Sequence, residues 1–321
     1  MTLELGSTGM GLDDVHRVVS TALAEDLRYG PDATTAACVP PGVVATATVS
    51  PRSPGTLAGL PVFLAVLDAV LGAGEYEIPA RRQDADRLAA GDVALALRAP
   101  MAGLLTAERT ALNLLCHLSG VATATAAWVA AVAGTGTAIR DSRKTLPGLR
   151  ALQKYAVRCG GGVNHRMGLG DAVLIKDNHV AVAGSVTAAI AAVRAAAPQP
   201  PCEVEVGTLD ELDEALAAKV ALVLLDNMTV AQCAEAVRRA EGSDTELEAS
   251  GRLTLDVASA YAATGVRYLA VGALTHSAPV LDIAMDLRPG EAVLNQLPAN
   301  RQLPLDPSHV TASRSGSAVS S

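Results

Sequence analysis

The chain has 321 residues, of which 50% are hydrophobic and 18% are charged; its net charge is −8, and it has one Phe, one Trp and five Tyr. The acidic balance and the scarcity of aromatic rings exclude a general nucleic-acid binder, which needs basic groups for phosphates and rings for bases. No apolar run of about 20 residues and no basic leader is evident, and the five cysteines form no CxxC pair. We therefore expect a cytoplasmic protein without nucleic-acid or membrane partners.

The first hundred residues alternate between helical and strand patterns. Apolar residues at helical spacing predict helices in 15–27 and 61–72, and alternating small and branched residues predict strands in 43–49 and 93–99. A long Ala- and Leu-rich stretch, 106–133, then predicts one or two helices. This half of the chain is therefore expected to mix α and β structure.

From Thr137 onward, six short apolar runs are separated by mainly helical stretches: TAIR, AVLIK, CEVEV, ALVLLD, ELEAS and YLAVG. Apolar strands that alternate with helices indicate parallel βα units. The last four runs recur about every 20–25 residues, which suits a (β/α) barrel, although six strands do not complete an eight-stranded one. The final segment, 289–321, is rich in Pro, Ser, Asn and Gln and is expected to be a disordered tail.

Positive charge gathers between residues 139 and 179, where eight basic residues accompany three acidic ones. Arg143 and Lys144 follow the run TAIR, and Lys176 ends AVLIK, so all three lie where a barrel has its active site, at the carboxyl ends of strands. Cations at that place in an acidic protein predict an anionic ligand. The helical stretch between them carries three more, which we interpret as a solvated helix face: Arg150, Lys154 and Arg158.

Two carboxylates occupy comparable places on later strands, Glu205 in CEVEV and Asp226 at the end of ALVLLD. An acid in an apolar strand costs free energy unless it is paired or binds a metal. Glu203 shares the face of Glu205, so one of the two could face solvent, and Asp226 could instead cap the next helix. Opposite the cations, these acids could hold a divalent metal through phosphate oxygens or stabilise a developing positive charge.

The segment DSRKTLPGLRALQKYAVRCGGGVNHRMGLGDAVLIKDNH resembles the central signature of the quinolinate phosphoribosyltransferases, or carboxylating nicotinate-nucleotide pyrophosphorylases. The likeness continues through ALAEDLRYGPDATT, ERTALNLLCHLSGVAT, EVEV, LLDNM, ELEASG and YLAVGALTHSAPVLDIAMDL. It implies an incomplete (β/α) barrel with an N-terminal α/β open-sandwich domain. On this basis we assign 1–117, completed by 277–288, to the sandwich domain and 118–276 to the catalytic barrel.

The resemblance also implies a homodimer that uses Mg²⁺ to transfer phosphoribosyl from phosphoribosyl pyrophosphate to quinolinate, with decarboxylation, in NAD biosynthesis. Arg109 would reach quinolinate in the partner's site, Lys144 would contact phosphoribosyl pyrophosphate, and Glu205 and Asp226 would lie near the ribose and the metal. Ser142 stands where the family is expected to have Thr. The other positions that match substrate contacts are Arg143, His165, Arg166 and Lys176 in the quinolinate pocket, and Ser250, Gly251, Gly272 and His276 at the sugar phosphate.

Other functions remain open on the residues alone. A class I aldolase-like lyase would use Lys176, at the end of a barrel strand, as a Schiff-base lysine. A non-enzymatic pyridine-nucleotide binder could be built on a decayed form of the fold, although every matched position carries a competent residue. A transferase for a related base is a third alternative, because the cations favour a dicarboxylate without specifying quinolinate.

Overall fold

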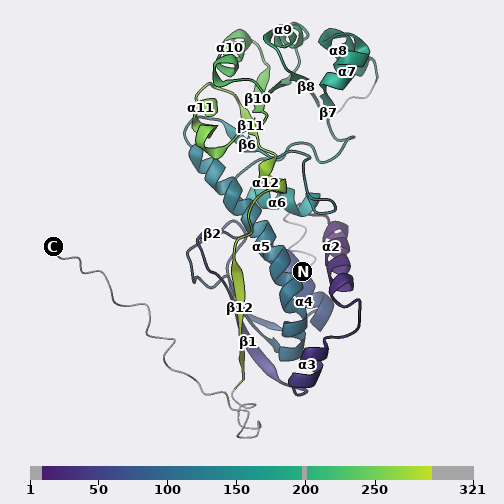
Figure 1. The fold of residues 1–321 in the computed structure, drawn as a ribbon, viewed down its shortest axis with the longest axis vertical. Coiled ribbons are helices and arrows are strands. Elements are labelled where there is room, and N and C mark those ends of the chain that lie inside the picture. The colour runs from purple at the N-terminus through teal and green to yellow at the C-terminus, as the bar shows by residue number, and fades with distance from the viewer. Residues whose placement is uncertain (1–8, 197–200, 291–321) are drawn as a thin grey trace, which may run out of the picture.

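A computed structural model describes residues 9–196 and 201–290 (Figure 1). The chain forms two parts joined by one long helix, α5 (Met101–Ala131), which runs from the first part into the second. The expected tail lies outside the described residues, except that the last strand extends to Pro289.

The first part is an antiparallel four-stranded sheet with helices packed on it. Its strand order is β12-β1-β5-β3, so the C-terminal strand completes a sheet that begins near the N-terminus (Figure 1). The predicted helices and strands of this part are confirmed to within a few residues, whereas α3, β2, β3 and β4 were not predicted. Its elements are α2 (Leu12–Asp26), α3 (Ala33–Cys38), β1 (Val44–Pro51), β2 (Gly55–Thr56), α4 (Leu60–Leu71), β3 (Glu77–Arg81), β4 (Arg87–Leu88), β5 (Leu95–Pro100) and β12 (Ile283–Pro289).

The second part is a six-stranded parallel sheet in the order β6-β11-β10-β9-β8-β7. All six predicted runs form its strands: β6 (Ala138–Arg140), β7 (Val173–Ile175), β8 (Cys202–Val206), β9 (Leu222–Asp226), β10 (Glu246–Ser250) and β11 (Tyr268–Ala270). The edge strands β6 and β7 are consecutive in the chain, but no ladder joins them within the described ranges. The sheet is therefore an incomplete barrel, and the predicted fold class is confirmed.

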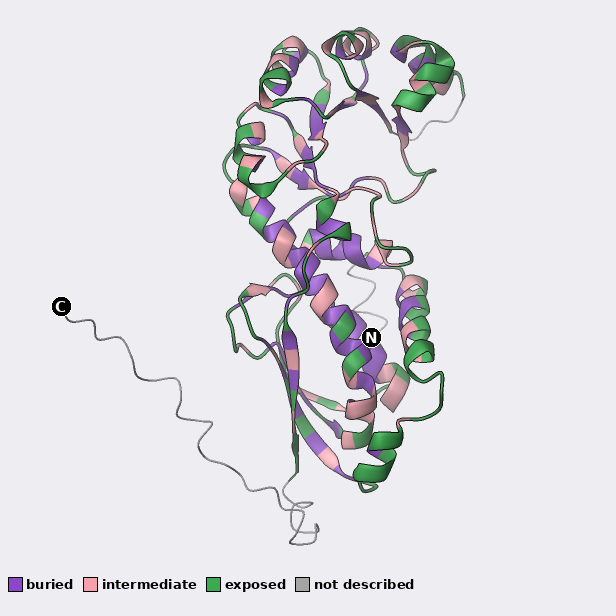
Figure 2. Ribbon diagram, in the orientation of Figure 1, coloured by how far each residue is buried: buried purple, intermediate pink, exposed green. Residues whose placement is uncertain are grey.

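Helices cover the outer side of this sheet and leave its strands buried (Figures 1 and 2). The strands are rich in Val and Leu, as expected for parallel strands covered by helices. The covering helices are α7 (Asp177–Ala183), α8 (Val186–Ala195), α9 (Leu209–Ala217), α10 (Val230–Ala240), the 3₁₀ turn η1 (Leu255–Val257) and α11 (Ala258–Ala262). Two further helices, α6 (Arg150–Cys159) and α12 (Ala273–His276), pack instead on α5 and on each other.

Helix α5 agrees with the first alternative, one helix rather than two, but it begins five residues earlier than predicted. It is a single helix of 31 residues, and by length and composition alone it could cross a membrane, contrary to the absence of such a run expected from the sequence. However, 56% of its apolar window is buried inside the protein, where it packs on α4 and α6. A helix that is apolar on most sides is typical of a protein core. It also passes through residues 117 and 118, where we divide the chain on sequence.

Candidate active site

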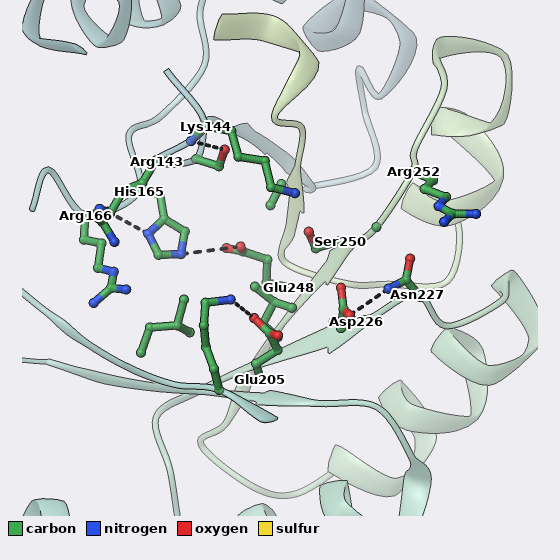
Figure 3. A pocket seen from close by; sticks show the side chains of 16 residues that line it. Arg143, Lys144, His165, Arg166, Glu205, Asp226, Asn227, Glu248, Ser250 and Arg252 are labelled. Atoms are coloured by element: carbon green, nitrogen blue, oxygen red, sulfur yellow. Dashed lines mark hydrogen bonds and ion pairs between the residues drawn. The ribbon is translucent and has the colours of Figure 1, made fainter. Parts of the chain in front are cut away.

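A cavity of about 510 Å³ lies at the carboxyl ends of the parallel strands (Figure 3). Figure 3 shows Arg143, His165 and Arg166 on one side of it, and Asp226, Asn227, Ser250 and Arg252 on the other. All the site residues predicted from the sequence line this cavity except Arg109, Gly272 and His276. The lining residues are Ser142, Arg143, Lys144, His165, Arg166, Leu174, Lys176, Glu205, Leu224, Asp226, Asn227, Glu248, Ser250, Gly251, Arg252 and Ala270.

The basic wall of the cavity carries unsatisfied donors. The Nε atoms of Arg143 and Arg166 are buried and have no hydrogen-bond partner within the described residues. Burial and the positive charge of Arg143 lower the pKa of Arg166. Crowded guanidinium groups with unused N–H donors are costly until an anion accepts from them. This wall therefore favours a ligand with more than one negative charge.

The two predicted carboxylates each have a neighbour that fixes them. Lys176, at the start of α7, forms an ion pair with Glu205 on the adjacent strand β8. Asn227 donates from Nδ2 to Oδ2 of Asp226 at 2.7 Å. The alternative role of Asp226, as the cap of the next helix, is not supported, because α10 is capped by Thr229.

The acidic side of the cavity is held by a close packing of two turns. Asn227 has a left-handed backbone (φ 55°), and its N–H donates to the carbonyl of Ser250 at 2.9 Å. A methyl group on Gly251 (φ 102°) would lie 2.7 Å from Cγ of Asn227, so only glycine fits there. Non-glycine residues in left-handed conformation concentrate at functional sites, and Arg252 (φ 50°) is a second one at this cavity.

At the floor of the cavity lies a buried ionic cluster of Arg140, Glu203 and Glu248, which the sequence did not reveal as part of the site. Glu203 and Glu248 both point inward, and Arg140 pairs with Glu248 at 2.5 Å and with Glu203 at 4.0 Å. Burial and the charge of Glu203 raise the pKa of Glu248 to about 7. Glu203 and Glu205 thus both face inward, so neither is the solvent-facing residue we considered. The alternation of side chains along β10 could have revealed Glu248, because this residue lies on the same face of the strand as Ser250, which was predicted to be in the site.

His165 joins this cluster with one defined tautomer. Its Nδ1 accepts a hydrogen bond from the backbone N–H of Arg166 at 2.7 Å, so the ring hydrogen lies on Nε2, which faces Glu203 at 3.0 Å. His165, Glu203 and Glu248 bring their ligand atoms within 4.8 Å of one another, as a metal site would require. To bind a metal, Nε2 would have to pass its hydrogen to Nδ1, which already accepts from Arg166, and Arg140 balances part of the negative charge. We therefore assign this cluster to support of the cavity floor.

Two predicted residues outside the cavity lining lie directly beside it. A methyl group on Gly272 would lie 3.0 Å from Cδ of Lys144, 3.3 Å from Oγ of Ser142 and 3.4 Å from Nε2 of His276. These three side chains therefore converge over one glycine. Arg109 lies apart, exposed on α5, in a hollow of about 230 Å³ that also includes Asp26 and Asp32. It forms no ion pair with another described residue.

The interpretation of α6 as a solvated charged face is wrong for Lys154. Its side chain is fully buried and forms an ion pair with Asp141, which is buried as well. The same ammonium donates to the carbonyl of His165 at 2.8 Å. Asp141 also accepts from the backbone N–H of His165 at 2.8 Å. This pair fixes the segment that carries His165 against the end of β6.

Comparison with known proteins agrees with this geometry. Residues 32–119 match the family model described as "Quinolinate phosphoribosyl transferase, N-terminal domain", and residues 121–286 match the corresponding C-terminal domain. The chain belongs to the quinolinate phosphoribosyltransferase family. The resemblance noted in the sequence is thereby confirmed.

Relatives in this family match along most of the chain. The "Nicotinate-nucleotide pyrophosphorylase [carboxylating]" of Mycobacterium leprae is 58% identical over 277 residues, which cover 86% of this chain and 98% of the relative. The human protein of the same name is 37% identical over 241 residues, covering 74% and 80%. The crystal structure of NadC from Streptococcus pyogenes has a TM-score of 0.83 and 39% identity, and covers 88% of this chain and 99% of that one.

Membership in the quinolinate phosphoribosyltransferase family decides between the alternatives raised by the sequence. The aldolase-like lyase and the non-enzymatic binder are set aside, because the relatives carry the name of an enzyme of phosphoribosyl transfer. Lys176, the lysine that a lyase would use, is paired with Glu205. Its role and those of the other site residues stay predictions.

Proposed function

We propose that this protein transfers phosphoribosyl from phosphoribosyl pyrophosphate to quinolinate, with loss of CO₂, to give nicotinate mononucleotide and pyrophosphate for NAD biosynthesis. The buried Nε atoms of Arg143 and Arg166, which have no hydrogen-bond partner among the described residues, carry the proposal. Quinolinate has two carboxylates, and guanidinium groups pair with carboxylates through parallel hydrogen bonds. Lys176 lines the same cavity and adds positive charge.

The second substrate brings phosphates to the remaining part of the cavity. Lys144, Gly272 and His276 lie together beside it, and Ser250 and Gly251 form the turn on its acidic side. We assign these residues to the phosphates and the ribose. Because the pyridine nitrogen attacks the anomeric carbon directly, no covalent nucleophile on the protein is required.

The carboxylates of Glu205 and Asp226 act on the charge that develops during transfer. As pyrophosphate leaves, the ribose becomes cationic. Fixed negative charges nearby stabilise this cationic state more strongly than they stabilise the bound substrate. The ring nitrogen of the resulting pyridine nucleotide is positive, which favours departure of the adjacent carboxylate as CO₂. Asn227 and Lys176 keep the two acids in place.

We include Mg²⁺ in the proposal because the donor set suits it. Glu205 and Asp226 offer carboxylate oxygens, the ligands that Mg²⁺ prefers, and would hold it partly through water and substrate phosphates. When bound, Mg²⁺ would screen the charge of the pyrophosphate and help it to leave.

Product analysis tests the proposed function. The purified chain is mixed with quinolinate, phosphoribosyl pyrophosphate and Mg²⁺, and products are separated by chromatography while released CO₂ is counted from labelled carboxylate. We expect nicotinate mononucleotide, pyrophosphate and CO₂ in equal amounts. Nicotinate in place of quinolinate is the matched control for a related base. Conversion of nicotinate alone would contradict the assignment of quinolinate.

Removal of the metal should abolish turnover. Pyrophosphate is a poor leaving group while its charge is unscreened, so activity is expected to fall to background in excess chelator and to return when Mg²⁺ or Mn²⁺ is added back. Zinc should not be found in stoichiometric amount by elemental analysis, because the chain lacks a Cys/His cluster. Full activity in chelator would contradict the role of the metal.

We further propose that two copies share their active sites, each giving Arg109 to its partner. The exposed position of Arg109, away from its own cavity, supports this arrangement. Arg109→Ala should weaken quinolinate binding about ten- to a hundredfold without unfolding the protein, and Arg109→Lys should rescue it only partly, because an ammonium cannot form a forked contact.

Mixing subunits tests the shared site directly. Arg109→Ala and Lys144→Ala chains, assayed at a quinolinate concentration at which neither alone turns over, should form hybrid dimers after exchange, with one site that contains both intact residues. We expect activity to return in the mixture and not in either parent. Confirmed exchange without recovered activity would mean that Arg109 serves its own subunit or none.

We place the protein in the cytoplasm, which its five free cysteines support.

A further inference from the structure

A buried amide lies directly under the segment that carries Lys144. Gln153, on α6, is fully buried. Its Oε1 accepts a hydrogen bond from the backbone N–H of Leu146 at 3.0 Å. Its Nε2 donates to the carbonyl of Thr275 at 2.6 Å and contacts Nε2 of His117 at 2.9 Å. Every donor and acceptor of this side chain is therefore used, and none of its contacts is with a charged group.

Thr275 extends these contacts to Lys144 itself. Its side chain is buried, and Oγ1 donates to the carbonyl of Lys144 at 2.8 Å. Leu146 donates to Gln153, Gln153 donates to Thr275, and Thr275 donates to Lys144; together with the backbone from Lys144 to Leu146, these bonds form a closed circuit. The circuit joins the turn after β6 to α12, which follows β11, at the carboxyl ends of two paired strands.

The ammonium group of Lys144 is not held by a contact of its own. Within the described ranges, Nζ of Lys144 has no hydrogen bond and no ion pair, unlike those of Lys154 and Lys176. What fixes the residue is its backbone and the passage of its side chain over Gly272, at 3.0 Å from a methyl group placed there. Gly272 lies three residues before Thr275, and both belong to the α12 turn.

We propose that Gln153 and Thr275 are positioning residues that set Lys144 against Gly272 for the phosphates of phosphoribosyl pyrophosphate. This inference rests on the proposed function. Neither residue lines the cavity or touches substrate; they act through the backbone of Lys144. The quinolinate side of the site is held separately, by Asp141 and Lys154 acting on His165. Loss of the circuit should therefore affect one substrate and spare the other.

Thr275→Val is the sharpest test, because it removes the hydroxyl and keeps the shape of the side chain. We expect KM for phosphoribosyl pyrophosphate to rise about three- to tenfold, the usual effect of one lost hydrogen bond, while KM for quinolinate stays within about twofold. Thr275→Ser keeps the hydroxyl and should restore the wild-type value. Gln153→Glu replaces the donor to the Thr275 carbonyl with an acceptor and should produce the same selective rise.

Thr137→Val is the matched control. Thr137 is also buried, and its hydroxyl donates to the carbonyl of Val266 at 2.7 Å, but it lies at the opposite end of β6. It should change neither KM. Thermal unfolding of each variant shows whether it is folded, and calorimetric titration with phosphoribosyl pyrophosphate and Mg²⁺ measures binding without turnover.

The outcomes separate this inference from the proposed function. If the wild-type chain neither binds phosphoribosyl pyrophosphate nor converts quinolinate, the proposed function fails and the inference fails with it. If the wild type is active and Thr275→Val binds phosphoribosyl pyrophosphate normally, only the inference is overturned. An equal rise of both KM values, or a rise in Thr137→Val as large as in Thr275→Val, would also overturn it, because the effect would then be general.

Discussion

Replacing Lys154 with methionine should lower the free energy of unfolding by about 3–5 kcal/mol, because it leaves a buried carboxylate without its partner. The side chains of Lys154 and Asp141 are both fully buried. Burial lowers the pKa of Lys154, and the charge of Asp141 opposes that shift. The loss is to be measured by equilibrium unfolding in urea. A loss below about 1 kcal/mol would show that the pair is not an essential support.

Two variants show that the loss comes from the buried charge. Lys219→Met removes an exposed lysine beyond α9 and should change stability by no more than about 0.5 kcal/mol. Adding Asp141→Asn to Lys154→Met removes the unpaired charge and should recover part of the lost stability. The double variant should still bind quinolinate poorly, because the carbonyl and N–H of His165 lose charged partners.

Asp226→Asn and Glu205→Gln should each lower kcat about a hundredfold, the size of effect seen when one group that stabilises transition-state charge is removed. Their KM values should change much less, since the charge matters most when the ribose is cationic. Steady-state kinetics with each substrate varied in turn measures both quantities.

The control for these variants is another strand carboxylate. Glu246 begins β10 at the end of the sheet away from the cavity, is exposed, and lies 3.3 Å from Arg267. Glu246→Gln should leave kcat and both KM values unchanged. Normal turnover in Asp226→Asn and in Glu205→Gln would mean that these acids only support the strands, and the proposed mechanism would then be wrong.

Much of the barrel could be predicted because its signals are local. Each strand is a short apolar run between helical stretches, and its last residues fall at one edge of the sheet by topology alone. For this reason the sequence alone predicts that Lys176 and Asp226 lie at the site, and both line the cavity. In the first part, α3 was not predicted because a helix of six residues is too short to show a helical spacing of apolar residues. Its N-cap is Asp32, which accepts a hydrogen bond from the N–H of Thr35 at 2.9 Å.

The supporting groups could not be predicted because they depend on packing between distant segments. Because Lys154 lies on an amphipathic helix, the sequence predicts that its side chain is exposed to solvent. Its buried partner, Asp141, lies thirteen residues earlier and is brought beside it only by the fold. Glu248 belongs to a strand whose other acid, Glu246, is exposed, so composition does not distinguish the two. The contact between Asn227 and Gly251 joins two turns that are separate in sequence.

The continuous α5 gives the proposed dimer a mechanical property. Arg109 and His117 lie eight residues apart on this helix, about 12 Å along its axis. His117 contacts Gln153 beneath its own cavity, whereas Arg109 would enter the cavity of the partner. A single continuous helix would therefore carry both the His117 contact below one site and the Arg109 contact in the other. A substitution that shifts this helix would change the Gln153 contact in its own subunit and the position of Arg109 in the cavity of the partner.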